Sequence, residues 1–317
     1  SDLQHFTLMK GVTESLAGRV SLLELENLAL AEISSERKTP WERPELLHLM
    51  ARGQFPELWR VPDLPRADFY ASYVATYLER DVRQILNVTS LRDFERFLRI
   101  LASRSANMLN KTDIARDVGI SVKAVGDWIS VLQASGQVVL LEPWFTNSDK
   151  RIVRTPKLYF RDSGLLCFLL NLDEKSLATS PALGAVWESF VFAELRKLNA
   201  ARARPVNFWY YRDQRAREID LVLEAGGRLS FVETKWQESP GKAEARTMEK
   251  VSAELEAAGG AWRPGPHHVV ATPAASPYAV SQDVTVRHVG DLGSVLESTW
   301  GETATRAASG ASRQPLV

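Results

Sequence analysis

Apolar residues recur along the chain with two different spacings. Over residues 68–86, and again over 94–101, they fall mainly three to five residues apart, which predicts amphipathic helices. After residue 205 they gather in short runs bounded by glycine and polar residues, which predicts strands. The strand runs are 206–211, 219–224, 229–236, 268–272 and 284–289, and further helices are expected over 184–199 and 243–258. The pattern predicts a helical part followed by a part that mixes helices and strands.

One stretch has the element order of a winged helix-turn-helix. Asn110 or Thr112 is expected to cap a short helix over 113–118, and Ser121 is expected to cap a second helix. A strand over 137–141 follows. Helix, short turn, helix and strand in this order predict the winged motif.

The second helix of this motif carries few groups that read bases. It contains Lys123 and Asp127 but no arginine, whereas base-reading helices usually present Arg, Lys, Asn or Gln. Trp128 is expected in the core, and packing or partner binding is at least as well supported as base reading. A basic run downstream is the better candidate for phosphate contacts, its alternative being a solvated linker. This run contains Lys150, Arg151, Arg154, Lys157 and Arg161.

Acidic residues interrupt two of the predicted C-terminal strands. Asp220 lies in one apolar run, and Glu233 and Lys235 lie two residues apart in the next, so that they share a face of the strand. Gly226-Gly227 predicts a hairpin turn between the two strands. The hairpin is expected to bring two carboxylates and one ammonium into a single cluster. Such a pair of carboxylates can bind Mg²⁺ while leaving positions open for water and phosphate.

This arrangement resembles the PD-(D/E)XK, or restriction-endonuclease-like, nucleases: Asp220 is followed after twelve residues by Glu233-Thr234-Lys235. The superfamily often adds an acid on a preceding helix, and Glu188 lies on the matching predicted element. The resemblance implies that Glu188, Asp220 and Glu233 bind Mg²⁺ or Mn²⁺. It also implies that Asp220, Glu233 and Lys235 are catalytic. Because Arg212 lies close to the predicted nuclease edge, it is a candidate for contact with nucleic acid. The alternatives are a solvated face for Glu-X-Lys and a nuclease fold used only for binding.

Short motifs over about residues 5–295 resemble, in the same order, a bacterial and archaeal AAA-type ATPase family with a C-terminal domain of unknown function. They include residues 9–19, 51–57, 77–81 and 156–166. The resemblance implies an ATPase module, a winged helix and a restriction-endonuclease-like domain in sequence. The Gly-X-X-X-X-Gly-Lys-Ser/Thr loop that binds ATP is absent from this chain. We therefore expect a chain that lacks the N-terminal phosphate-loop portion and has no ATPase activity, with ATP a cofactor only where that portion is present. Arg19 would face nucleotide in an intact member, or be an ordinary helix-end cation.

The predicted fold class is α/β (α+β): a helical segment with a winged helix-turn-helix, then a restriction-endonuclease-like mixed sheet flanked by helices. Four parts are expected in sequence. They are an ATPase remnant over 1–65, a helical and winged-helix part over 66–148, a nuclease-like part over 149–300 and a disordered tail over 301–317.

Composition narrows the function classes. The 39 Lys and Arg residues equal the 39 Asp and Glu residues, so bulk charge supports neither nucleic acid nor membrane as a partner. The single Cys167 lies in an apolar run and fits a cytoplasmic location. No run approaches the roughly 18 apolar residues of a membrane span. The expected partners are DNA, another protein, or a second copy through the ATPase portion. The two hypotheses are Mg²⁺-dependent DNA hydrolysis and a non-catalytic DNA- or protein-binding regulatory module coupled to an ATPase.

Overall fold

The computed structural model describes residues 25–33, 39–77, 91–145, 154–259, 262–271 and 276–301. Arg19, Lys150 and Arg151 lie outside these residues, as do the predicted helix beyond Tyr77 and the predicted tail beyond Gly301. The chain divides into two compact units, each assembled from segments that are distant in sequence. Unit 1 contains Ser1–Leu28, Leu47–Leu140 and Thr155–Phe190, and unit 2 contains Ala29–Leu46, Leu141–Arg154 and Val191–Val317.

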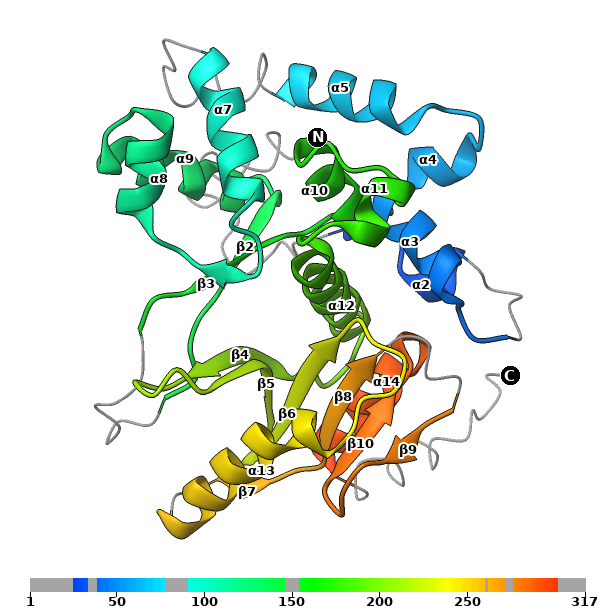
Figure 1. Cartoon of the computed structure of the whole chain (residues 1–317), viewed down its shortest axis with the longest axis vertical. Helices are drawn as coiled ribbons and strands as arrows, with labels where there is room; N and C mark the ends of the chain where they lie inside the picture. The colour runs from blue at the N-terminus through cyan, green and yellow to red at the C-terminus, as the bar shows by residue number, and fades with distance from the viewer. Residues whose placement is uncertain are drawn as a thin grey trace, which may run out of the picture. The chain divides into compact units, whose positions relative to one another are not determined.

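Unit 1 is mostly helical and carries a small sheet (Figure 1). The sheet has the order β1-β3-β2, in which β1 pairs antiparallel with β3. The strands are β1 (Asn107–Met108), β2 (Val138–Leu141) and β3 (Lys157–Phe160). The helices are the C-terminal part of α3 (Arg43–Arg52), α4 (Pro56–Arg60), α5 (Arg66–Tyr77), α7 (Leu91–Ala102), α8 (Lys111–Val118), α9 (Val122–Ala134), α10 (Ser163–Leu169), α11 (Glu174–Thr179) and the start of α12 (Leu183–Ala200).

The predicted winged helix-turn-helix order is confirmed in unit 1. The side chain of Asn110 accepts from the backbone N–H groups of Thr112 and Asp113, so Asn110 is the N-cap of α8. Ser121 caps α9 by accepting from the N–H of Ala124 at 3.1 Å. The short strand β1 ahead of α8 was not predicted, because two residues are too few to show alternation.

Trp128 on α9 belongs to the core of this motif, as predicted. Its side chain is 8% exposed. The ring centroid lies 5.0 Å from that of Phe94 and 5.2 Å from that of Phe97, both on α7. These aromatic contacts hold the second helix of the motif against α7 and remove Trp128 from the contact surface.

Two sequence motifs far apart in unit 1 meet at the carboxylate of Asp162. Its Oδ2 accepts from the backbone N–H of Gln54 at 2.9 Å and from Asn27 Nδ2 at 3.0 Å. Its Oδ1 accepts from Tyr70 Oη and from the N–H of Leu165, both at 2.8 Å. Burial, followed by the Asp162 charge, raises the pKa of Tyr70 well above its usual value. The phenol therefore stays protonated and donates to the carboxylate.

Two glycines allow the backbone to approach this carboxylate closely. Gly53 has a φ of +79°, and a Cβ there would clash with Tyr70 Oη and Asp162 Oδ1. A Cβ on Gly164 would in turn clash with the backbone of Gly53. The motifs over 51–57 and 156–166 are therefore explained by packing between chain segments.

Unit 2 is built on a seven-stranded mixed sheet with the order β4-β5-β6-β8-β10-β9, and β7 also pairs with β6. Neighbouring strands are antiparallel in β4/β5, β5/β6 and β9/β10, and parallel in β6/β7, β6/β8 and β8/β10. The strands are β4 (Asn207–Arg212), β5 (Glu218–Ala225), β6 (Arg228–Lys235), β7 (Arg263–Pro264), β8 (His267–Ala271), β9 (Tyr278–Ala279) and β10 (Val284–Arg287). The other elements are α2 (Leu30–Ile33), the first residues of α3, the C-terminal part of α12, α13 (Lys242–Ala257), the 3₁₀ helix η2 (Val289–Asp291) and α14 (Leu292–Trp300).

Helices cover both faces of this sheet. His267 stacks on Phe231, which packs in the core cluster together with Met248 of α13. The next residue, His268, points to the other face, where its Nε2 lies 3.1 Å from Ser298 Oγ of α14. The predicted α+β class, a helical part followed by a mixed sheet flanked by helices, is confirmed.

The predicted hairpin between β5 and β6 is also confirmed. Gly226 and Gly227 have φ angles of 57° and 76°, the positive values that a type I′ turn requires at both central positions. They join the paired residues Ala225 and Arg228.

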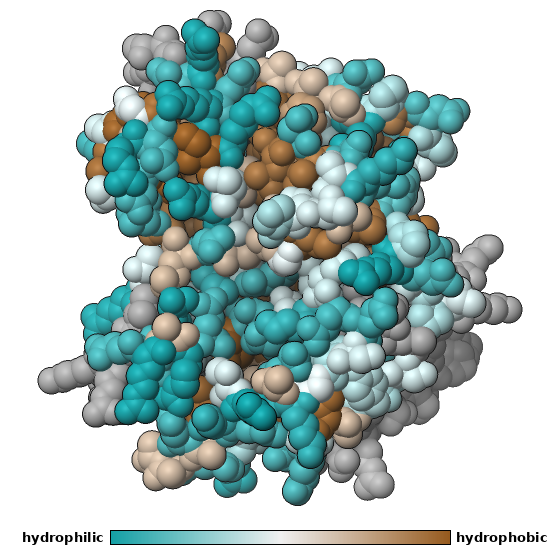
Figure 2. All heavy atoms as spheres, viewed as in Figure 1, coloured by the Kyte–Doolittle hydropathy of each residue, from teal (hydrophilic) through white to brown (hydrophobic). Residues whose placement is uncertain are grey.

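Hydrophilic side chains cover much of the face shown in Figure 2, while hydrophobic groups gather among the helices of unit 1. In the described part of the chain, no helix combines the length and apolar character needed to cross a bilayer.

Candidate functional site

The candidate site in unit 2 lies where β5 and β6 separate. The two strands pair from their glycine turn as far as Leu221 and Val232. Beyond that pair, β5 continues beside β4 and β6 continues beside β8. Asp220 and Glu233 are the next residues on the two diverging strands, so the sequence signal for a nuclease falls at a fork in the sheet.

A β-bulge re-aims Asp220 at this fork. Trp209 pairs with Val222 and Tyr211 pairs with Ile219, so one residue of β4 lies opposite two residues of β5, Asp220 and its successor. Bulges bend the strand and often lie next to functional sites because they redirect a side chain. The alternation of apolar residues does not reveal the bulge, because the bulge changes the pairing at a single position of the strand.

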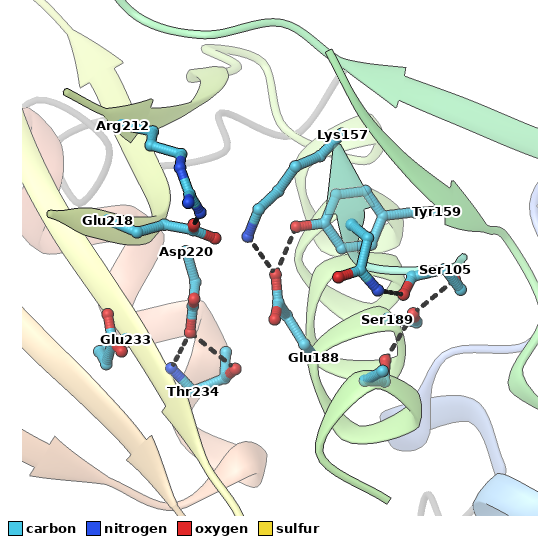
Figure 3. Close-up of polar contacts among 12 residues, drawn as sticks. Ser105, Lys157, Tyr159, Glu188, Ser189, Arg212, Glu218, Asp220, Glu233 and Thr234 are labelled. Atoms are coloured by element: carbon cyan, nitrogen blue, oxygen red, sulfur yellow. Dashed lines mark hydrogen bonds and ion pairs between the residues drawn. The ribbon is translucent and has the colours of Figure 1, made fainter. Parts of the chain in front are cut away.

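The Asp220 carboxylate bridges the fork. Its Oδ2 accepts from the backbone N–H of Thr234 at 2.8 Å and from Thr234 Oγ1 at 3.0 Å, and the residue is 8% exposed. Figure 3 shows this carboxylate directed at Thr234, with Glu233 apart from the pair. The carboxylate therefore replaces the ladder hydrogen bond that β5 no longer supplies to β6.

Glu233 and Lys235 share a face of β6, as predicted, and form an ion pair. Lys235 Nζ donates to Glu233 Oε1 at 2.6 Å. Because β6 keeps a regular register on β8 through these residues, alternation turns Thr234 to the opposite face. The described contacts thus join Asp220 to Thr234 and Glu233 to Lys235, and a single cluster of the three residues stays a prediction.

Glu188 belongs to unit 1, where its carboxylate takes part in a buried polar group. Its Oε1 accepts from Lys157 Nζ at 2.9 Å and from Tyr159 Oη at 2.5 Å (Figure 3). Lys157 is 2% exposed, so its ammonium is committed to Glu188 and is not presented to a phosphate as predicted. Ser189 Oγ, beside Glu188, lies 3.0 Å from Ser105 Oγ. Lys157 and Tyr159 lie two residues apart on β3, and that spacing is the only sequence sign that they share a face.

The other predicted basic contacts lie in varied surroundings. Arg212 forms an ion pair with Glu218, the residue that begins β5. Arg154 lies over the ring of Phe145 at 5.8 Å, and Arg161 pairs with Glu26. Contacts of these arginines with nucleic acid stay predictions.

Metal binding by Glu188, Asp220 and Glu233 stays a prediction. Among the described residues, no group of three or more His, Cys, Asp or Glu side chains is arranged to hold a metal ion. Mg²⁺ requires near-octahedral oxygen ligands, of which the protein usually supplies one or two carboxylates. Each of the three acids accepts at least one hydrogen bond from the protein: Glu188 from Lys157, Asp220 from Thr234 and Glu233 from Lys235.

Burial strongly shifts the pKa of three further side chains. It raises the pKa of the Cys167 thiol to about 12, which keeps it a neutral core group. It also lowers the pKa of His267 to about 4 and that of His268 to about 3. His267 Nδ1 accepts from the backbone N–H of Phe231 at 3.1 Å, so this ring stabilises the interior of the sheet.

Comparisons with known proteins match two successive parts of the chain, and the boundary between them lies just ahead of α12. Residues 43–176 match the model of a domain of unknown function (DUF8612), and residues 183–287 match the model of another domain of unknown function (DUF4143). Two similar relatives are the uncharacterized proteins Rv2008c of Mycobacterium tuberculosis and Mb2031c of Mycobacterium bovis. Each is 32% identical over 248 residues, which cover 78% of this chain and 53% of the relative. The chain therefore spans about half the length of these curated relatives, and what it matches is two successive domains of unknown function.

Proposed function

We propose that this chain is a nucleic-acid-binding module that works beside an ATPase portion in the cytoplasm, on a nuclease-like scaffold that does not itself cleave. The observation that carries the proposal is that each of the three acids, Glu188, Asp220 and Glu233, already accepts a hydrogen bond from a protein donor. The winged helix-turn-helix supplies the architecture for nucleic-acid binding. The resemblance to the AAA-type family supplies the argument for an ATPase portion.

The protein partners of Glu188 and Glu233 oppose recruitment of a metal. Ligation through Glu188 Oε1 would separate this oxygen from Lys157, which is 2% exposed. Leaving one member of a buried ion pair without its partner costs about 3–5 kcal/mol. Ligation through Glu233 Oε1 would likewise displace Lys235 from its 2.6 Å contact. A binding role requires neither change.

The test is binding of DNA in the presence and absence of Mg²⁺. Fluorescence anisotropy with a labelled duplex and a labelled single strand, at about 50 mM salt, should show binding that does not require Mg²⁺ and weakens steeply as salt rises. Calorimetry with MgCl₂ should show no heat of binding, and plasmid DNA should stay intact. Absence of binding to both DNA probes would overturn the proposal, as would cleavage that Asp220→Ala abolishes.

A second candidate is Mg²⁺-dependent phosphodiester hydrolysis of DNA. The specific observation in its favour is the fork with a bulge at Asp220, on the strand next to Glu233-Thr234-Lys235. Plasmid and linear DNA incubated with Mg²⁺ or Mn²⁺ should then be cut by the wild type. Asp220→Ala and Lys235→Ala should both lose that cleavage, and cleavage that survives in either variant would exclude this assignment.

A further inference from the structure

Arginines gather at the end of the unit 2 sheet that carries the β5–β6 turn. Arg228 begins β6 and lies in register with Arg263 of β7. Arg204 lies over the ring of Trp300, with its Cζ 5.4 Å from the ring centroid, and its carbonyl accepts from Trp300 Nε1 at 3.1 Å. We call Arg204, Arg228 and Arg263, together with Trp300, the arginine patch.

The end of α14 joins the members of this patch. A Cβ on Gly226 of the turn would lie 3.4 Å from the Trp300 ring. A Cβ on Gly301 would lie 3.4 Å from Arg228 Nη1. Trp300 and its successor thus stand against the β5–β6 turn, and Arg204 is brought to the same end of the sheet as Arg228 and Arg263.

The arginine patch carries positive charge that the described residues do not neutralise. Within the described ranges, no ion pair involves Arg204, Arg228 or Arg263, and Arg228 Nε is buried without a hydrogen-bond partner. Like charges on directly paired strand residues repel each other, as at Arg228 and Arg263. An anion placed between their guanidinium groups would relieve this repulsion and supply acceptors.

We propose that the arginine patch binds the phosphate backbone of nucleic acid. This inference rests on the proposed function and assigns a surface to it outside the winged helix and away from the fork. Guanidinium groups bind phosphate through paired N–H donors. Strands lie about 4.8 Å apart, while phosphates rise about 3.4 Å per nucleotide along a duplex strand, so neighbouring arginines can reach successive phosphates.

The chemistry of the patch favours contact with the backbone over base reading. Arg204 already covers the Trp300 ring, which leaves that ring face to the protein rather than to a base. The patch contains no Asn or Gln side chain of the kind that reads adenine. Binding at this surface should therefore be independent of sequence.

A membrane surface fits the patch less well. Basic segments that bind bilayers usually place apolar side chains beside their cations, ready to insert. The large hydrophobic residues exposed in the described part of the chain are Leu25, Val61, Val122, Phe145 and Tyr278, and none belongs to the patch.

The test compares two triple variants with the same change in charge. Arg204→Gln/Arg228→Gln/Arg263→Gln removes the patch. Lys242→Gln/Arg246→Gln/Lys250→Gln removes three exposed cations from α13 in the same unit. Each phosphate contact contributes about 0.9 to the slope of log K against log salt for duplex DNA. The patch variant should lower the magnitude of that slope by about 2–3, whereas the α13 variant should lower it by less than about 1.

A single substitution distinguishes loss of the phosphate contact from misfolding of the triple variant. Arg263 is exposed, so Arg263→Gln should keep the wild-type thermal midpoint and lower the slope by about 1. Unchanged DNA binding in both patch variants would overturn this inference and leave the proposed function standing. Equal losses in the patch and α13 variants would also overturn it, because general charge would then explain the binding. A wild type that binds phosphatidylserine vesicles but neither DNA probe would overturn both proposals.

Discussion

Basic side chains at the two ends of the unit 2 sheet differ in whether they form ion pairs. At the fork end, Arg212 pairs with Glu218, Lys235 pairs with Glu233, and Arg217 pairs with both Asp213 and Glu254. At the turn end, the three arginines of the patch take part in no ion pair among the described residues. A chain with equal numbers of acidic and basic residues therefore still carries a local excess of positive charge. That difference directs a search for anionic ligands to the turn end, although the nuclease-like sequence signal lies at the fork.

The largest expected effect on stability comes from two histidines in the interior of the sheet, between its two ends. Burial lowers the pKa of His267 to about 4 and that of His268 to about 3, whereas the unfolded value is about 6.5. The unfolded chain takes up these protons first, so this contribution to stability is complete above about pH 6.5 and is lost as pH falls toward 4. Between pH 7 and pH 5 the loss should be about 2 kcal/mol per histidine.

Urea unfolding at the two pH values measures this loss. His268→Asn should reduce the difference between pH 7 and pH 5 by roughly half, whatever its effect on stability at pH 7. A variant that keeps the full pH difference would show that His268 does not carry the effect.

A smaller effect is expected from Asp220→Ala at the fork. The change leaves the N–H and hydroxyl of Thr234 without this acceptor, and Thr234 is 7% exposed. The free energy of unfolding should fall by about 2–4 kcal/mol, and by about 1 kcal/mol for Asp220→Asn, which keeps an acceptor oxygen. Lys235→Met is the matched control. The side chain of Lys235 is 36% exposed, so solvent screening should hold its loss to about 0.5 kcal/mol. Equal losses for Asp220→Ala and Lys235→Met would indicate one connected cluster at the fork.

The smallest effect should come from inorganic phosphate at the turn end. At equal ionic strength, exchanging chloride for phosphate should raise the free energy of unfolding by up to about 1 kcal/mol, because a ligand of the folded state stabilises it by mass action. Arg228→Gln/Arg263→Gln should lose this gain, and Arg212→Gln at the fork end should keep it. A gain that depends on Arg212 would reverse the comparison between the two ends.

Local sequence patterns predict much of the fold because they report contacts that are close in sequence. The helix-turn-helix shows its caps at Asn110 and Ser121, and the β5–β6 hairpin shows its two glycines. Alternation on β6 correctly places Glu233 and Lys235 on one face. The position of Asp220 relative to this pair is harder to predict from alternation, because the bulge on β5 and the fork interrupt the simple pairing of the hairpin.

The remaining features depend on contacts between distant residues. In the sequence Lys157 belongs to a basic run, but its partner Glu188 lies 31 residues away. The members of the arginine patch are likewise scattered, at Arg204, Arg228, Arg263 and Trp300. Only the folded sheet brings them to one end. Arg19, Lys150 and Arg151 lie outside the described residues, and their roles stay predictions.

The strand order of unit 1 constrains how the winged motif folds during synthesis and how it can be transferred to another protein. The middle strand of its sheet is β3 (Lys157–Phe160), which follows β2 in the chain only after a segment that belongs to unit 2. On the ribosome, β1 and β2 must therefore wait for Phe160 to emerge before their sheet can close. A gene fragment that stops at residue 148 would encode both outer strands without the strand that lies between them. Any attempt to graft this motif onto another protein must carry the later segment with it.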